Sequence, residues 1–184
     1  MKKIIIVGMV GFFVALLTGC GTVENAVLLD PYTNYFPVHK DRQASVTVSK
    51  KVSINSDTLK SLLVVPSKDY WKKMGENLDY FDEVLTFSQF ANVIIKKGLA
   101  GKISRLDDIQ GLSRVYDLYK PFFILELTDV WKKGGGGLTT ILTLYDPKST
   151  DTIFESEIKP GIWGLSDQRT VFPLLNSLLD YLRE

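Results

Sequence analysis

The chain has 184 residues, and its 22 lysines and arginines nearly balance its 21 aspartates and glutamates. This near-neutral charge excludes the basic excess typical of proteins that bind nucleic-acid phosphates, so no nucleic-acid partner is expected. Its length and its 45% hydrophobic content suit one folded domain that buries a real core. The single cysteine excludes a disulfide within the chain.

The first twenty residues have the pattern of an export signal. Lys2 and Lys3 precede an apolar run from Ile4 to Leu17, which is shorter than the roughly 20 residues that span a bilayer. The run ends in the sequence LTGC, so the only cysteine, Cys20, follows it directly. The pattern predicts that residues 1–19 are a signal peptide and are removed.

The sequence LTGC resembles the bacterial lipobox, in which the cysteine sulfur receives a diacylglyceryl group and a peptidase cuts just before the cysteine. The resemblance implies that Cys20 is lipidated and begins the mature chain. With Lys2 and Lys3 removed, 20 of the 22 basic residues stay against 21 acidic ones, a net charge of −1. Two or three acyl chains such as palmitate would hold the protein at the membrane without a spanning helix, since each buried CH₂ contributes about 0.8 kcal/mol.

The residue after the cysteine bears on which membrane holds the protein. In Gram-negative lipoproteins an aspartate at this position commonly retains the protein in the inner membrane, and this chain has Gly21 there. We therefore expect a lipid-anchored, periplasm-facing protein of the cell outer membrane. The inner membrane and a Gram-positive cell membrane stay open as alternatives.

Residues 20–45 are expected to be the lipidated linker segment, although their composition differs from that of a Gly/Ser-rich tether. They include seven apolar residues that would be costly to leave in water: Val27, Leu28, Leu29, Tyr32, Tyr35, Phe36 and Val38. Two interpretations stay open. The segment packs on the edge of the domain, or it forms a contact surface for the membrane or a partner.

A single periplasmic domain is expected over residues 46–184. It begins with a half-buried strand whose apolar face would carry Val46, Val48, Val52 and Ile54. The continuous apolar run in 61–66 predicts a buried strand. A short helix or loop is expected at 68–78, and a short strand at 82–85.

Two helices are expected next. Thr86 and Gln89 match a capping box, a stripe of apolar residues follows at helical spacing, and Gly98 suits the position just past the helix. The sequence from Asp107 to Lys120 predicts the second helix, which ends before Pro121.

Three strands and a helix complete the chain. Residues 122–131, 138–145 and 152–158 read as a β-meander, and a stripe of apolar residues at helical spacing predicts a helix over 171–182. The predicted fold is α/β (α+β), a two-layer sandwich in which a mixed, mostly antiparallel sheet has helices packed on one face.

No constellation of residues predicts a reaction, a metal site or a cofactor. The lysines of 132–137 (KKGGGG) precede the glycines, the reverse of a phosphate-binding loop, so we expect a flexible hairpin loop. His39 has no second histidine or cysteine at ligand spacing. Two acidic clusters do not match a calcium loop and are interpreted as charges at helix starts: Asp79, Asp82 and Glu83, and Asp107 and Asp108.

The three tryptophans, Trp71, Trp131 and Trp163, are expected in the core or at an interface. Trp163 stands between glycines in the sequence Gly161-Ile162-Trp163-Gly164. It is the candidate interface residue because exposed aromatic side chains anchor protein contacts. A core plug is the alternative.

Three stretches look like those of a poorly characterised group of bacterial lipoproteins: YFDEVLTFSQF (80–90), YKPFFILEL (119–127) and FPLLNSLLDYL (172–182). The layout of residues 46–182 loosely resembles the envelope domains of the TolB N-terminal and CsgG type, which implies an architecture and no functional residues. The expected function is a non-enzymatic binding or assembly module with an envelope protein partner. The alternatives are a self-associating subunit of an envelope or secretion complex and, less favoured, an envelope enzyme.

Overall fold

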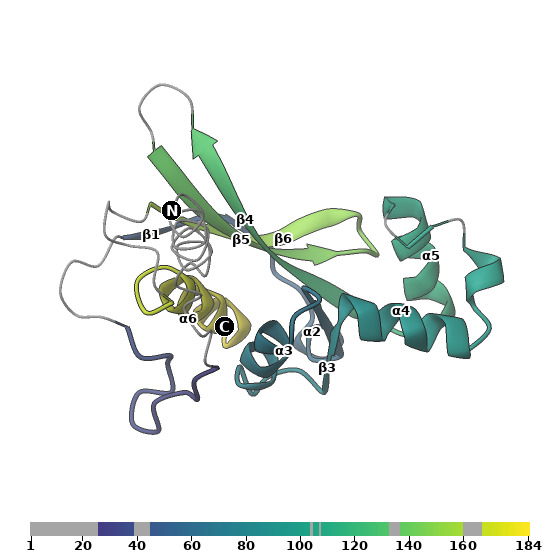
Figure 1. Ribbon diagram of the computed structural model, residues 1–184, viewed down its shortest axis with the longest axis horizontal. Helices are drawn as coiled ribbons and strands as arrows, with labels where there is room; N and C mark the ends of the chain where they lie inside the picture. The colour runs from purple at the N-terminus through teal and green to yellow at the C-terminus, as the bar shows by residue number, and fades with distance from the viewer. Residues whose placement is uncertain (1–25, 39–44, 104, 107, 133–136, 160–166) are drawn as a thin grey trace, which may run out of the picture.

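The computed structural model describes residues 26–38, 45–103, 105–106, 108–132, 137–159 and 167–184 (Figure 1). A mixed sheet of six strands is arranged in the order β1-β6-β5-β4-β2-β3. The strands are β1 (Val46–Lys51), β2 (Leu62–Val65), β3 (Glu83–Thr86), β4 (Phe122–Lys132), β5 (Gly137–Asp146) and β6 (Asp151–Ile158). The neighbouring strands β1, β6, β5 and β4 pair antiparallel. Strand β2 is parallel to both of its neighbours, β4 and β3. The predicted α+β class with a mixed sheet is confirmed.

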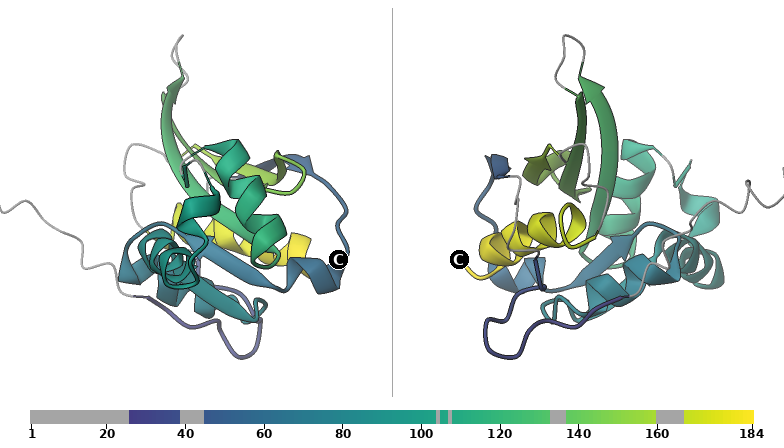
Figure 2. Two further views of the ribbon diagram at one scale, coloured as in Figure 1. Left: turned by 90° about the vertical axis from the view of Figure 1, so that its right-hand side faces the viewer. Right: turned by 60° about the vertical axis from the view of Figure 1, so that its left-hand side comes forward.

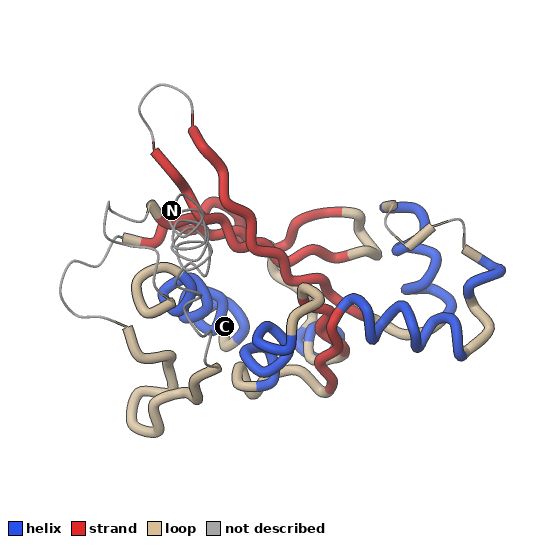
Figure 3. Tube along the Cα trace, in the orientation of Figure 1, coloured by secondary structure: helices blue, strands red, loops and turns tan. Residues whose placement is uncertain are grey.

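The helices lie between and around these strands (Figure 3). They are α2 (Ser56–Leu59), α3 (Asp69–Glu76), α4 (Phe87–Lys96), α5 (Ile109–Leu118) and α6 (Val171–Leu182), with a short 3₁₀ helix η1 (Ala100–Lys102). The single turns α2 and η1 were not among the expected elements. No helix in the described ranges is long and apolar enough to span a bilayer.

One face of the sheet is covered by α3 and α6. Leu63 and Val65 of β2, Phe123 and Leu125 of β4, and residues of β5 and β6 join the two helices in one core cluster. The apolar stripe expected on α6 is fully used, because Val171, Leu174, Leu175, Leu178, Leu179 and Leu182 are all buried. Each such buried leucine contributes about 1.5–3 kcal/mol relative to an exposed one.

On the opposite face the described helices α4 and α5 cover β2, β3, the start of β4 and Tyr145 near the end of β5. Along β2 and β4, residues of this second core cluster alternate with those that face α3 and α6. The cluster contains Leu62, Val64, Phe122, Ile124, Phe90, Ile94 and Val115. Helices therefore cover both faces there, and the expectation of helices on one face is wrong for this half of the sheet. The crossovers β2–α3–β3 and β3–α4–α5–β4 run in opposite directions along the sheet, so a common handedness places their helices on opposite faces.

The boundaries of α4 follow the sequence signals. Thr86 accepts a hydrogen bond from the Gln89 backbone at 3.2 Å, and the Gln89 side chain accepts one from the Thr86 backbone at 3.1 Å. Gly98 has a φ of 68°, the left-handed conformation that often ends a helix. The predicted capping box and glycine stop are confirmed.

Residues 26–38 pack on the domain beside α6. Phe36 is 1% exposed, and its ring stacks on that of Phe172 with 5.6 Å between centroids. The Asn176 side chain accepts a hydrogen bond from the Phe36 amide at 2.8 Å and donates one to its carbonyl at 3.0 Å. The domain boundary expected at residue 46 therefore leaves out a residue that helps to fill the core.

β1 forms one edge of the sheet. Val46 packs against the core, but Val48 and Val52 are 47% and 40% exposed. The register against β6 shifts between Val48 and Lys50, so regular alternation stops there. The expected continuous apolar face from Val46 to Ile54 is wrong because an irregular edge strand interrupts it.

Candidate functional site

The hairpin of β4 and β5 runs past the rest of the sheet (Figure 1). β4 pairs with β2 only from Phe122 to Ile124, but it pairs with β5 as far as Lys132. β6 joins β5 only from Thr140 onward. Among the described residues, 130–132 and 137–139 therefore pair only with each other, and we call this two-stranded part the arm.

The arm carries a large exposed aromatic side chain. Trp131 is 75% exposed and Val130 is 36% exposed. Trp131 lies opposite Leu138 in the register, so its neighbour across the hairpin is also apolar. At the base of the arm the Thr140 hydroxyl donates a hydrogen bond of 2.6 Å to the Asp129 carboxylate. The pairing fixes the strand that holds Trp131 while leaving most of its ring accessible.

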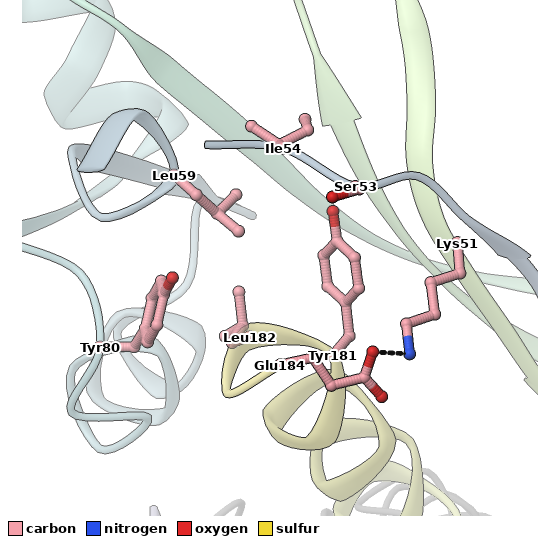
Figure 4. A pocket seen from close by; sticks show the side chains of 8 residues that line it. All are labelled: Lys51, Ser53, Ile54, Leu59, Tyr80, Tyr181, Leu182 and Glu184. Atoms are coloured by element: carbon pink, nitrogen blue, oxygen red, sulfur yellow. Dashed lines mark ion pairs between the residues drawn. The ribbon is translucent and has the colours of Figure 1, made fainter. Parts of the chain in front are cut away.

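A groove lies at the carboxyl end of α6 (Figure 4). Its volume is about 370 Å³, and its lining combines apolar and aromatic side chains with polar and charged ones: Lys51, Ser53, Ile54, Leu59, Tyr80, Tyr181, Leu182 and Glu184. Lys51 and Glu184 form an ion pair across one side. The volume is at the lower end of the range of small-molecule sites, about 300–1,000 Å³.

The titratable groups of this groove favour binding over proton transfer. The Tyr181 hydroxyl donates a hydrogen bond of 2.7 Å to the Val52 carbonyl, and burial is the main cause that raises the pKa of Tyr181 to about 12. Burial also raises the pKa of Tyr80, with the Asp57 charge as a second cause. Both phenols are neutral near pH 7, and a general base needs a pKa near the working pH.

A smaller crevice of about 200 Å³ lies between the end of β2 and the middle of β4, lined mainly by apolar residues with Glu126 at one side. The carboxyl ends of parallel strands are a common ligand site, often with a helix amino terminus that holds an anion. The nearby amides of Ser88 and Gln89 already donate to Ser67 Oγ at 3.1 Å and to Thr86 Oγ1 at 3.2 Å. These amides are therefore committed to protein acceptors.

Several residues singled out in the sequence lie outside the described residues: Cys20, His39, Asp107, Gly134 and Trp163. Gly137, the last of the four glycines, is the first residue of β5 and has a φ of 68°. Trp71 is 9% exposed within the first core cluster, which confirms a core position.

The two acidic clusters have different roles. Asp108 caps α5 by accepting a hydrogen bond of 2.5 Å from the Gly111 amide, as predicted for charge at a helix start. The same prediction is wrong for Asp79, Asp82 and Glu83. Asp79 follows α3 with a φ of 50°, and Glu83 lies in β3, where it pairs with Lys120. Across the described part of the chain, no group of three or more His, Cys, Asp or Glu residues could hold a metal ion.

Trp131 was expected in the core or at an interface, and the structure leaves it 75% exposed. The register does put Trp131 on the same side as Phe123, Leu125 and Leu127, but the apolar cover ends before residue 131. Asp129, at the same side, was the available signal, because a charged residue in an apolar alternation marks the point where the face leaves the core. The groove at α6 had no comparable signal, since its lining comes from distant segments.

Few known proteins are similar to this chain. No protein-family model matches the chain, and no curated protein matches it. One solved structure is similar, the PelC dodecamer from Paraburkholderia phytofirmans, at 16% identity over 76% of this chain and 97% of that chain. Its TM-score is 0.34, which is too low to support an argument from that structure.

Proposed function

We propose that the protein is an acyl-anchored lipoprotein of the cell envelope that acts as a non-enzymatic binding or assembly module. The observation that carries the proposal is the arm, where Trp131 is 75% exposed on a strand held by regular pairing. Anchoring through Cys20 supplies the location, as the LTGC sequence implies. An envelope protein is the proposed partner.

The arm has the chemistry of a contact site. Tryptophan is enriched among the residues that carry most of the binding energy of protein interfaces. Leu138 lies opposite Trp131 on the same face of the hairpin, while Val130, the residue before Trp131, lies on the other face. A partner that covers this end would bury the indole ring, which contributes more contact area than most other side chains.

The groove at α6 supports binding as well. Its lining includes Ile54, Leu59 and Leu182, its phenols stay protonated near neutral pH, and its ion pair lies at one side. Such a lining accommodates an apolar group and offers no activated nucleophile. The proposal therefore describes a module that recognises other molecules.

Two variants test the two parts of the proposal. Cys20→Ser should abolish the incorporation of labelled fatty acid, because serine lacks the sulfur that is acylated. Label retained by this variant would contradict the anchor.

Trp131→Ala tests the binding surface. We expect the acylated variant to melt like the wild type but to migrate in native gels of solubilised envelopes as a smaller species. Ile95→Ala is the matched control, since Ile95 is an apolar residue of α4 that is 59% exposed. Equal migration of the wild type and both variants would contradict the role of the arm.

The same gels distinguish the main alternative, a self-associating structural subunit. In that case purified protein alone would form the larger species, without other envelope proteins. The exposed edge of β1, where Val48 is 47% exposed, is the feature that favours this alternative.

A further inference from the structure

A tight loop near the start of the described chain presents two exposed apolar side chains. Leu28 is 73% exposed and Tyr32 is 95% exposed, although the neighbouring Phe36 is buried in the core. We call residues 28–35 the tyrosine loop.

Hydrogen bonds hold the tyrosine loop in one shape. The Asp30 carboxylate accepts from the amides of Tyr32 and Thr33 at 2.9 Å and 3.0 Å. The Asn34 amide donates to the Asp30 carbonyl at 2.7 Å, and the Asp30 amide donates to the Tyr35 carbonyl at 2.8 Å. A loop closed at both ends in this way holds Tyr32 outward at little further loss of conformational freedom.

The base of the loop is fixed to α6 and its carboxyl end. The Tyr35 hydroxyl hydrogen-bonds to Asp180, while Arg183 donates to the Asn34 carbonyl at 2.8 Å and lies 5.2 Å from the centre of the Tyr35 ring. The loop is therefore held in a fixed orientation relative to the rest of the domain.

The distance to the proposed anchor is short. Five residues lie between Cys20 and Ala26, the first residue that the structure describes. In any conformation the six Cα-to-Cα steps from Cys20 to Ala26 span at most about 22 Å. An acyl group on Cys20 would therefore keep Ala26, and the loop that begins two residues later, close to the membrane surface.

We infer that the tyrosine loop lies on the lipid bilayer that holds the acyl anchor, with Leu28 and Tyr32 inserted at its interface. The inference rests on the proposed lipid attachment at Cys20. Tyrosine suits this position because its ring is apolar and its hydroxyl stays hydrated, which is why it is enriched at membrane interfaces. The leucine adds apolar area on the same loop.

The charges around the loop give no basic excess that would select anionic headgroups. Hydrogen bonds from the backbone amides of Thr33 and Tyr32 lower the pKa of Asp30, so its carboxylate stays ionised. Asp180 and Arg183, which contact Tyr35, carry opposite charges. Contact with zwitterionic lipid is therefore sufficient, and added salt should change it little.

This orientation directs the arm away from the membrane. In both views of Figure 2 the tyrosine loop lies at the bottom of the molecule, and the end of the β4–β5 hairpin lies at the top. A protein held by its tyrosine loop would present Trp131 to the space beyond the membrane surface.

Site-specific fluorescence of the full acylated protein in phosphatidylcholine vesicles tests this inference. Thr33→Cys places a label in the tyrosine loop, and Thr128→Cys places the same label on β4, since both threonines are exposed. The Thr33 hydroxyl accepts a long hydrogen bond of 3.4 Å from the Tyr35 amide and also hydrogen-bonds to Asp30. Thr33→Cys keeps the two backbone hydrogen bonds to the Asp30 carboxylate that shape the loop. Vesicles that contain nitroxide-labelled headgroups should quench the label at residue 33 and leave the label at residue 128 at its level in plain vesicles.

A second variant separates insertion from mere proximity. Leu28→Ser with Tyr32→Ser, added to Thr33→Cys, should lose most of the quenching while the protein still floats with the vesicles. Flotation with equal fluorescence at residues 33 and 128, or quenching unchanged by the two serines, would overturn this inference alone. Failure to float would overturn the anchor and this inference with it.

Discussion

In the parallel half of the sheet the strands are buried on both faces, whereas in the antiparallel half the described helices cover only one face. Leu62, Leu63, Val64 and Val65 of β2 are all at most 1% exposed. By contrast, Glu126 and Thr128 of β4 are exposed, and Glu155 and Glu157 of β6 are half-buried. The first half acts as the rigid centre of the domain, and the second half supplies the accessible surfaces.

β4 belongs to both halves and shows where the change occurs. Its first residues, Phe122 to Leu125, are at most 7% exposed, and its end carries Trp131 at 75% exposed. The sequence changes at the same point, from the continuous run FFIL to ELTDVW, in which charged residues recur. A change from continuous to interrupted apolar sequence within one strand thus marks the limit of its helical cover.

The largest effect should separate the two ends of β4. Phe122→Ala removes a fully buried ring that lies 4.7 Å from Phe90 and 6.0 Å from Tyr116, centroid to centroid. We expect a loss of about 3–5 kcal/mol in the free energy of unfolding, measured by chemical denaturation. Trp131→Ala should change it by no more than about 0.5 kcal/mol. Similar losses for both variants would show that the arm is packed.

The next effect concerns residues 26–38, which pack beside α6 in the core on the helix-covered face of the antiparallel half. Asn176→Ala leaves the Phe36 amide and carbonyl without their side-chain partner, so we expect a loss of about 1–3 kcal/mol in a denaturation experiment. Gln168→Ala, which truncates an exposed amide near α6, is the control and should be nearly neutral. A neutral Asn176→Ala would mean that the segment does not contribute to stability.

A cap in the parallel half gives a smaller effect. Thr86→Ala removes the acceptor for the Gln89 amide and should cost about 1 kcal/mol in the free energy of unfolding. Thr128→Ala, the same substitution at an exposed position of β4, should be within about 0.5 kcal/mol of the wild type. Equal changes in the free energy of unfolding for the two variants would show that the Thr86 cap does not stabilise α4.

The smallest effect appears only in alkaline solution. The pKa of Tyr181 is raised to about 12 in the folded protein, above the usual value of 10.0, mainly because burial disfavours the charged phenolate. The unfolded chain therefore loses this proton first, and the contribution present below pH 10 should be lost as the pH rises toward 12. Tyr181→Phe should show a shallower loss over this range in pH-dependent melts. If the melting temperature falls equally steeply with pH in the wild type and in Tyr181→Phe, the raised pKa of Tyr181 would be contradicted.

The elements of the fold were largely predictable because each has a local signal. The stripe on α6 and the capping box of α4 are patterns within a few residues of one another, and both are confirmed. The packing of helices on both faces of β2 was not predictable from such patterns, since it depends on the direction in which each crossover connection runs.

The candidate surfaces were less predictable. Tyr32 and Trp131 are exposed because the packing of segments distant in the sequence does not reach them, which no local pattern predicts. The groove unites Lys51, Tyr80 and Tyr181, which no spacing in the sequence relates. The lipidation of Cys20 is a prediction from the sequence alone.

The most direct test of the account is photo-crosslinking in intact cells, with a photoreactive amino acid placed either at Trp131 or at Ile95 of the acylated protein. Both positions are exposed and apolar, at 75% and 59%, but one belongs to the arm and the other to α4 in the parallel half. The account predicts a discrete adduct with another envelope protein from position 131 and no such adduct from position 95. Adducts of equal yield from both positions, or none from position 131 in a protein that is acylated and folded, would contradict it.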